Sequence, residues 1–403
     1  MKILVINTGS SSIKYQLFDM QKKQAMVSGL AEKIGEETSS LEHEVIDENG
    51  DRRKKEEDQR IADHSQGLNR IVELLIDPEF GVIHDKSEIT AVGHRVVHGG
   101  ESFHSSTVID EKVLQAIKEN IPLAPLHNPP NLEGIEVSSS IFPDAPQVAV
   151  FDTAFHQTIP AKSYLYAVPY DLYKEHKVRR YGFHGTSHAY VAEEAAAYLD
   201  KPLSELNLIT LHLGNGASMS AVQGGRCLDT SMGLTPLEGL VMGTRSGDVD
   251  PAIPFFLAKN LNLSLEKIDR LLNKESGMKG LCGTNDMREV EDRAAAGEKK
   301  AQTALDVYVY RIKKYIGSYF AAMGKLDALV FTAGIGENSP LVRERSCENL
   351  QGLGIEIDPE KNEERSKGIR DIRSGRYPVK VLVIPTNEEK RIALETEAVL
   401  SKT

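Results

Sequence analysis

Two short segments of this 403-residue sequence combine small residues with polar side chains, as anion-binding loops do. Residues 7–14 read NTGSSSIK and residues 212–218 read HLGNGAS. Small residues allow backbone N–H groups to approach phosphate oxygens, while Asn, Ser and Lys14 add donors and charge. Neither segment matches the Walker pattern or the dinucleotide fingerprint. Each alone is typical of an ordinary β-hairpin turn, but two in equivalent places indicate paired phosphate loops.

The same pattern of expected strands and helices occurs twice along the chain, and it would position these two segments. Each segment joins two expected strands, because apolar residues run or alternate on both sides of it. Strand-to-loop-to-helix patterns follow at residues 326–344 and 379–400, and a further strand ends at Asp152. The sequence therefore predicts two related α/β halves, each opening with a hairpin whose tip can meet an anion.

Eight blocks of sequence resemble the acetate kinase family, which includes acetate, propionate and butyrate kinases of the actin-like ATPase superfamily. The blocks, in family order from about residue 1 to residue 398, are NTGSSSIKYQLF, GHRVVHGG, FDTAFHQT, YGFHGTSH, HLGNGAS, MGTRSGDVDP, FTAGIGENS and PTNEE. The resemblance implies two actin-like (ribonuclease H-like) α/β domains with an active-site cleft between them. The expected domains are residues 1–151 with 388–403, and residues 152–387, which bind the nucleotide. A homodimer is also implied.

The residue types themselves suit phosphoryl transfer to a carboxylate, which depends on positioning and charge neutralisation more than on covalent chemistry. Arg95 and Arg245 lie beside loops of glycine or small residues, and a guanidinium can hold a carboxylate or a phosphoryl group with two hydrogen bonds. A surface ion pair is the ordinary alternative for an arginine. The resemblance implies that Arg95 binds the acetate carboxylate and that Arg245 stabilises the transferred phosphoryl group.

Three more residues are expected near the reacting atoms. The resemblance implies that His184, in YGFHGTSH, stabilises the transition state and that His127 helps to position the substrate. Asp152 ends a strand, a usual place for a catalytic carboxylate in α/β folds, although capping the following turn is an equal alternative. The family treats this residue as an acid or base. Because acetate is already ionised at pH 7, we expect Asp152 to act electrostatically and to orient its neighbours.

A magnesium ion is expected beside the phosphates of ATP, with Mn²⁺ able to substitute. Mg²⁺ takes few protein ligands, so an oxygen of Asn7 and the carboxylate of Glu388 would suffice. Glu389 fits the spacing equally well, and Glu388 is chosen by resemblance.

The nucleotide, ATP or ADP, is expected mostly on the second half. FTAGIGEN places glycines at a helix start, where backbone can pass close to adenine and ribose, and TNDMRE resembles the family's nucleoside contact. A helix cap is the alternative at Asp286. The residues expected to bind the nucleotide are Lys14, His212, Leu213, Gly214, Asn215, Gly216, Asp286, Met287, Arg288, Gly334, Ile335, Gly336, Glu337 and Asn338.

A pocket sized for a methyl group is expected next to Arg95 and His184. By position in the sequence and by resemblance, its walls are Val97, Leu126, Phe183 and Pro236. Core packing is the alternative for each of them.

The expected function is reversible, magnesium-dependent transfer of the γ-phosphoryl group of ATP to acetate, giving acetyl phosphate and ADP by in-line displacement. A propionate kinase is the nearest alternative, since the acyl groups differ by one methylene. A nucleotide-gated interaction protein of the actin or chaperone type is an alternative from another class. Such a protein has no need of Arg95, His184 and Arg245 around an acyl-sized pocket.

Composition limits the partners and the compartment. The 48 Lys and Arg against 59 Asp and Glu give a net charge of −11, which argues against nucleic-acid binding by bulk charge. Three scattered cysteines fit a reducing cytosol. The longest uncharged stretch, residues 207–225, contains His212 and four glycines and does not suit a membrane span. We expect a cytoplasmic enzyme without nucleic-acid or membrane partners.

Overall fold

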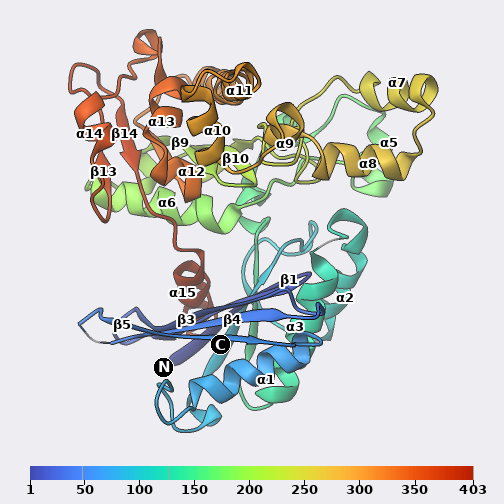
Figure 1. Cartoon of the computed structure of the whole chain (residues 1–403), viewed down its shortest axis with the longest axis vertical. Coiled ribbons are helices and arrows are strands. Elements are labelled where there is room, and N and C mark those ends of the chain that lie inside the picture. Colours follow the sequence, from blue (N-terminus) through green and yellow to red (C-terminus); the bar gives the residue numbers. More distant parts are fainter. Residues whose placement is uncertain (48, 126, 403) are drawn as a thin grey trace. The chain divides into compact units, whose positions relative to one another are not determined.

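The computed structural model describes every residue of the chain except 48, 126 and 403. It divides the chain into two units, Met1–Phe155 with Asn387–Thr403, and His156–Thr386 (Figure 1). The second domain was expected to begin at Asp152, whereas this residue lies in the first unit. The reason is local, because its backbone N–H donates to the carbonyl of Val96 at 2.8 Å and its carboxylate accepts from Arg95.

The first unit is built on an eight-stranded sheet in the order β5-β4-β3-β2-β1-β6-β8-β7. Strands β1, β6 and β8 run parallel, and the remaining pairs are antiparallel. The strands are β1 Lys2–Gly9, β2 Ser12–Asp19, β3 Gln24–Glu32, β4 Ser39–Ile46, β5 Arg52–Gln59, β6 Ala91–Val96, β7 Thr107–Val108 and β8 Gln147–Phe151.

Helices cover both faces of this sheet, as the alternation along β1 requires. Leu4 and Ile6 belong to the core cluster that contains the buried residues of α1, whereas Ile3 and Val5 pack with those of α15. The last helix of the chain therefore returns to the first unit and fills the face opposite α1. The helices of this unit are α1 His64–Leu75, α2 Glu111–Glu119, α3 Asn128–Ile141 and α15 Glu388–Leu400.

The second unit contains a six-stranded sheet in the order β11-β10-β9-β12-β14-β13. Its strands are β9 Asn207–Leu213, β10 Ala217–Gln223, β11 Arg226–Thr230, β12 Ala328–Thr332, β13 Arg370–Asp371 and β14 Lys380–Val383. The order β11-β10-β9-β12-β14 repeats β3-β2-β1-β6-β8, with the same hairpin pairs followed by the same parallel pairs. The prediction of two related actin-like α/β halves is confirmed.

Every residue of β9 is buried, as expected for a central strand covered on both faces. Helices α6 and α11 both pack against β9, and they lie on opposite sides of the sheet (Figure 1). The helices of this unit are α4 Ala161–Tyr164, α5 Tyr170–His176, α6 Gly185–Tyr198, α7 Ala252–Leu261, α8 Leu265–Lys274, α9 Gly277–Cys282, α10 Met287–Ala295, α11 Lys299–Met323, α12 Ala333–Asn338, α13 Pro340–Cys347 and α14 Pro359–Glu363.

Short 3₁₀ helices complete the chain at Lys86–Glu88, Ile121–Leu123, Ala154–Thr158, Leu203–Glu205 and Gln351–Leu353. Within the part of the chain that the structure describes, no helix combines the length and the apolar character needed to cross a bilayer.

Candidate active site

In the first unit, three parallel strands bring predicted site residues to one edge of the sheet. Ile6 pairs with His94 across β1 and β6, and Val96 pairs with Phe151 across β6 and β8. Parallel strands end on the same side. Asn7, Arg95 and Asp152, which lie at or next to these pairs in the sequence, therefore share this edge.

Arg95 lies between two carboxylates at this edge. Its Nη2 donates to Asp152 Oδ2 at 3.0 Å, and its Nε lies 3.9 Å from Glu388 Oε2 at the start of α15. The Asp152 side chain is only 1% exposed. Burial disfavours the charged guanidinium, but the two carboxylates outweigh it and raise the pKa of Arg95. Arg95 is therefore a permanent cation held in a fixed orientation.

The two glutamates that open α15 have different surroundings. Glu389 is buried and pairs through Oε1 with Lys14 Nζ at 2.7 Å. Glu388 instead faces Arg95, and its pKa is raised to about 7, chiefly by burial and further by the negative charges of Asp152 and Glu389. Crowded carboxylates of this kind are relieved by a bound cation.

The donor set around Glu388 fits magnesium better than a metal held by protein alone. Among the residues that the structure describes, no group of three or more His, Cys, Asp or Glu side chains is placed to hold a metal ion. Mg²⁺ commonly uses one or two protein oxygens together with water and substrate phosphates. A carboxylate of Glu388 and the amide oxygen of Asn7 are donors of the right type.

Two buried amides that were not predicted as site residues support this edge. Asn131 of α3 accepts from the Val97 N–H at 3.0 Å and donates to the carbonyl of Thr8 at 2.9 Å. Asn128 accepts from the His98 N–H at 3.1 Å and donates to its carbonyl at 3.0 Å. The signal for them in the sequence was HNPPN, which places two Asn residues in the first turn of a helix.

Two predicted substrate residues of this unit, Val97 and His127, lie among the described residues. Val97 is buried, with 4% of its surface exposed, and its backbone is fixed by Asn131. His127 is partly buried and directly precedes α3. Leu126 lies outside the described residues.

In the second unit, the hairpin tip after β9 lies against two predicted catalytic side chains. A side-chain carbon built on Gly216 would lie 3.5 Å from His184 Nε2 and 3.6 Å from Arg245 Nη1. The glycine therefore leaves room beside both groups for another molecule. His184 directly precedes α6 and has a left-handed backbone at φ 57°, a conformation that is uncommon for residues other than glycine.

Arg245 has an electrostatic setting unlike that of Arg95. Its Nη1 donates to the carbonyl of Pro236 at 3.2 Å. Across the described part of the chain, no Asp or Glu forms an ion pair with it, and burial lowers its pKa. A partly buried arginine without an acidic partner favours an external anion.

A histidine and serine network holds His184 in place. His184 Nδ1 bonds to Ser218 Oγ at 2.8 Å, and Ser218 also bonds to His188 Nε2 at 2.8 Å. The pKa of His188 is lowered well below its ordinary value, first by burial and then by neighbouring histidines. The His184 ring stacks on His212 with centroids 4.1 Å apart. Ser218 and His188 were missed as positioning residues although both lie inside quoted motifs.

The predicted nucleotide segments also meet in this unit. Asn215 Oδ1 accepts from Asn285 Nδ2 at 3.0 Å, which links the hairpin tip to the segment containing Asp286. Gly336 of α12 packs against the end of β9, because a side-chain carbon there would lie 3.6 Å from the Leu211 carbonyl. Glu337 Oε1 accepts from the Thr386 N–H at 3.1 Å.

Three other predicted nucleotide and pocket residues have the following surroundings. Lys14 belongs to the first unit, where it pairs with Glu389. Arg288 is 89% exposed and pairs with Asp286, which caps α10. Phe183 is fully buried, and its carbonyl accepts from His156 Nε2 at 2.9 Å.

Residues 2–394 match the profile of the Acetokinase family. The chain is 56% identical over 405 aligned residues to an acetate kinase of Desulfotalea psychrophila, with 100% of both chains covered. Among solved structures, it is similar to the acetate kinase of Porphyromonas gingivalis, at 45% identity and a TM-score of 0.92, with 99% of both chains covered. It is also similar to a propionate kinase of Francisella tularensis, at 44% identity and a TM-score of 0.92, with 99% of both chains covered.

Proposed function

Because this chain belongs to the acetokinase family, we propose that it catalyses the reversible, magnesium-dependent transfer of the ATP γ-phosphoryl group to acetate. The products are acetyl phosphate and ADP, formed by direct in-line displacement. The observation that carries the proposal is the setting of Arg245. It is a partly buried cation beside His184 and Gly216, and it has no acidic partner among the described residues. Such a setting suits the negative charge that a transferred phosphoryl group carries.

Residues of the first unit bind the acceptor in this proposal. Arg95 holds the acetate carboxylate with charge-assisted hydrogen bonds, and Asp152 keeps the guanidinium in the required orientation. An acetate ion has no proton to lose at pH 7, so the carboxylate of Asp152 has an electrostatic and orienting task.

Residues of the second unit bind the nucleotide and stabilise the transition state. The hairpin tip at 212–216 and the start of α12 cradle ATP through backbone groups, and Asp286, Met287 and Arg288 border its nucleoside. His184 donates a hydrogen bond to the transferred phosphoryl group, and Arg245 neutralises its charge. Lys14 adds a cation for the phosphates from the first unit.

Asn7 and Glu388 would hold Mg²⁺, or Mn²⁺ in its place, by their side-chain oxygens. The ion supplies charge neutralisation for the phosphates of ATP. The residues of the protein then need only orient the nucleotide and the acceptor.

Acetate is proposed as the preferred acyl substrate, with Val97, Leu126, Phe183 and Pro236 around its methyl group. The similarity to an acetate kinase and to a propionate kinase is nearly equal, at 45% and 44% identity. A hydrophobic pocket discriminates one methylene by only about 1–3 kcal/mol. Propionate should therefore be a poorer but measurable substrate.

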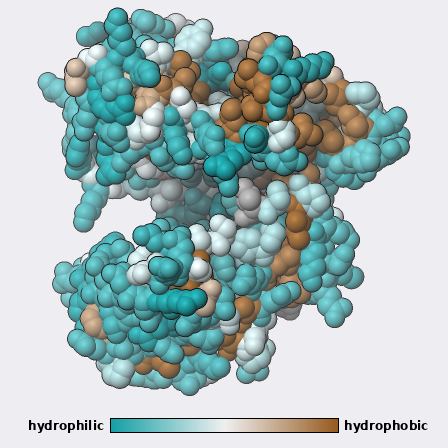
Figure 2. All heavy atoms as spheres, turned by 45° about the vertical axis from the view of Figure 1, so that its right-hand side comes forward, coloured by the Kyte–Doolittle hydropathy of each residue, from teal (hydrophilic) through white to brown (hydrophobic). Residues whose placement is uncertain are grey.

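We further propose a cytoplasmic homodimer, formed through an apolar surface on the second unit. Helix α7 has the sequence AIPFFLAKNL, and none of its ten residues is buried. Phe255 is 66% exposed and Phe256 60%. Figure 2 shows hydrophobic residues gathered on the surface of this unit. A continuous apolar patch in contact with water is unfavourable, and a second copy of the chain would cover it.

A hydroxylamine trap tests the proposed activity. Purified protein is incubated with ATP, Mg²⁺ and acetate, propionate or butyrate, and acyl phosphate is trapped as the hydroxamate. We expect hydroxamate in the order acetate, propionate, butyrate. ATP hydrolysis without hydroxamate would instead indicate a nucleotide-gated interaction protein, and a preference for propionate would overturn the acetate assignment.

A further inference from the structure

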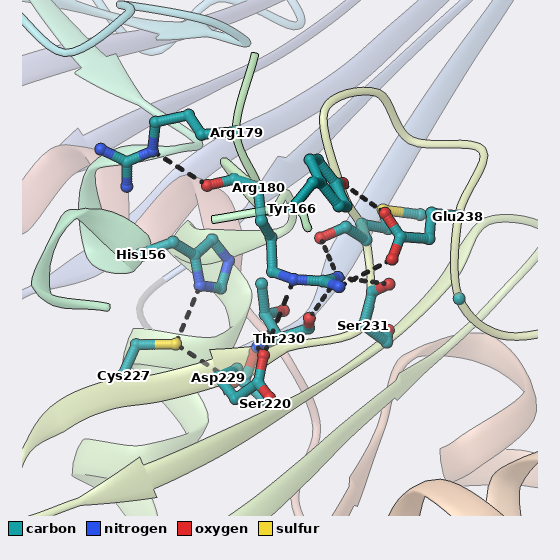
Figure 3. Close-up of polar contacts among 12 residues, drawn as sticks. His156, Tyr166, Arg179, Arg180, Ser220, Cys227, Asp229, Thr230, Ser231 and Glu238 are labelled. Atoms are coloured by element: carbon teal, nitrogen blue, oxygen red, sulfur yellow. Dashed lines mark hydrogen bonds and ion pairs between the residues drawn. The ribbon is translucent and has the colours of Figure 1, made fainter. Parts of the chain in front are cut away.

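A cluster of Arg180, Glu238 and Tyr166 lies in the second unit, outside the predicted site residues (Figure 3). Arg180 Nη2 pairs with Glu238 Oε1 at 2.7 Å, and the side chain of Arg180 is only 16% exposed. The Tyr166 hydroxyl donates to the other oxygen of Glu238. We refer to these three residues as the Arg180 cluster.

The Arg180 cluster holds the loop between β11 and the segment that contains Arg245. Arg180 Nη1 donates to three consecutive carbonyls, those of Thr230 at 2.9 Å, Ser231 at 3.2 Å and Met232 at 3.2 Å. The Tyr166 hydroxyl accepts from the Leu234 N–H at 2.9 Å. The backbone of this loop is therefore held by hydrogen bonds to Arg180 and Tyr166.

This loop connects the two catalytic side chains of the proposed mechanism. Its Gly233 carbonyl accepts from the N–H groups of Tyr181 at 3.0 Å and Gly182 at 3.3 Å, in the segment that leads directly to His184. Its Pro236 carbonyl accepts from Arg245 Nη1 at 3.2 Å. The Arg245 side chain and the backbone just before His184 are thus both attached to one loop, and Arg180 itself belongs to the segment that leads to His184.

Stability alone does not account for such a cluster. A buried ion pair loses solvation on folding, and replacing it with apolar residues is often neutral or stabilising. Its particular property is geometric, because a guanidinium bonds to a carboxylate and to several carbonyls in one plane, which an ammonium group does not reproduce.

We propose that the Arg180 cluster is a positioning device that sets the placement of His184 and Arg245 around the transferred phosphoryl group. The proposal rests on the proposed kinase function. A displacement of about 1 Å in a catalytic group can cost about 100-fold in rate. Because these groups act in the transition state, the loss falls on kcat and leaves substrate KM values nearly unchanged.

Two variants test the cluster, and one matched variant serves as the control. Arg180→Lys keeps the charge and removes the planar guanidinium, and Tyr166→Phe removes one hydroxyl and leaves the ion pair. Arg70→Lys is the control, since Arg70 also pairs with a glutamate, bonding to Glu57 at 2.9 and 2.6 Å in the first unit. Each variant is measured for kcat, both KM values, melting temperature, and binding of ATP and of ADP with aluminium fluoride and acetate.

We expect kcat to fall about 100-fold in Arg180→Lys, with a smaller fall in Tyr166→Phe and none in Arg70→Lys. Affinity for the aluminium fluoride complex, which imitates the transition state, should fall by the same factor while ATP affinity is retained. If Arg180→Lys does not fold, Tyr166→Phe decides the question.

Unchanged kcat per folded enzyme, or a loss confined to KM or melting temperature, would overturn the positioning role. Absence of hydroxamate from the wild-type protein would overturn the kinase function, and this proposal with it.

Discussion

At the scale of single residues, Arg95 and Arg245 show how neighbours decide what an arginine does. Arg95 is surrounded by the carboxylates of Asp152 and Glu388, which raise its pKa against the effect of burial. Burial lowers the pKa of Arg245. Arg95 is oriented by neighbouring carboxylates of the protein, whereas Arg245 is suited to bind the anionic group of a substrate. These settings predict different consequences of substitution.

Replacing Arg95 with Ala should raise the KM for acetate and lower kcat, with much less effect on the KM for ATP. A hydrogen bond to a charged group contributes about 1.5–3 kcal/mol, so the expected loss in kcat/KM for acetate is about 10- to 100-fold. Steady-state kinetics with each substrate varied in turn measures the effect. An unchanged acetate KM with normal turnover would remove Arg95 from the acceptor site.

The solvent isotope effect tests the role of Asp152. If this carboxylate orients Arg95 and transfers no proton, the rate of the isolated phosphoryl-transfer step should be nearly equal in H₂O and D₂O. Asp152→Asn should still reduce turnover strongly, because the charged partner of Arg95 is lost. A large isotope effect on that step, measured by rapid quench, would favour proton transfer instead.

Magnesium dependence distinguishes the two glutamates. Glu388→Ala should require more Mg²⁺ for half-maximal rate, because a ligand oxygen is removed. Glu389→Ala is the matched control, since its carboxylate is paired with Lys14. A shift in Glu389→Ala alone would transfer the metal role to that residue.

At the scale of elements, buried polar side chains join strands to the helices that position the site. His94 of β6 bonds through Nε2 to Gln147 of β8 at 2.7 Å, and the same amide oxygen accepts from Ser138 of α3 at 2.9 Å. Burial lowers the pKa of His94 to about 4, against the hydrogen bond that the His94 ring donates to Gln147 Oε1, which favours the charged form. The protonation of His94 therefore makes the stability of this packed sheet depend on pH.

The sign of that linkage gives a prediction. An unfolded histidine titrates near pH 6.5, so between pH 6.5 and 4 the unfolded chain binds more protons than the folded one, and stability falls as pH falls. With a folded pKa of about 4, His94 should contribute a loss of about 3 kcal/mol across this window. His94→Leu should reduce the slope of unfolding free energy against pH, measured by urea denaturation. A slope equal to that of the wild type would contradict the prediction.

At the scale of the whole molecule, the two units repeat one strand order, and the chain completes the first unit only with its last helix. Helix α15 supplies both Glu388 and Glu389, and its buried Ile392 packs with Ile3 and Val5 of β1. The first unit therefore requires both ends of the chain to form its core.

The exposed face of α7 gives a prediction about assembly. Replacing Phe255 and Phe256 with Ser should convert a dimer into a monomer, because the apolar area that a second copy would bury is lost. Sedimentation velocity measures the change. Ile76→Ser, at a residue of the first unit that is 41% exposed, is the control and should leave assembly unchanged. A dimer that persists in the double variant would place the interface elsewhere.

Much of this molecule could be predicted from the sequence, because its signals are local. Apolar residues on both sides of each hairpin tip predicted strands β1, β2, β9 and β10, which the structure confirms. Anion binding by the polar tips between them stays a prediction. The internal repetition of this pattern predicted two related α/β halves, which the strand order confirms.

Contacts between residues distant in sequence were decided only by the tertiary structure. Spacing left Glu388 and Glu389 equivalent, whereas packing of α15 directs one toward Arg95 and the other toward Lys14. The strand that leads to Asp152 was predicted from its local pattern. That it belongs to the first unit depends on its pairing with β6, which the local sequence does not indicate. The Arg180 cluster was missed for the same reason. Its three members are ordinary in their own segments, and only the fold brings Tyr166, Arg180 and Glu238 together.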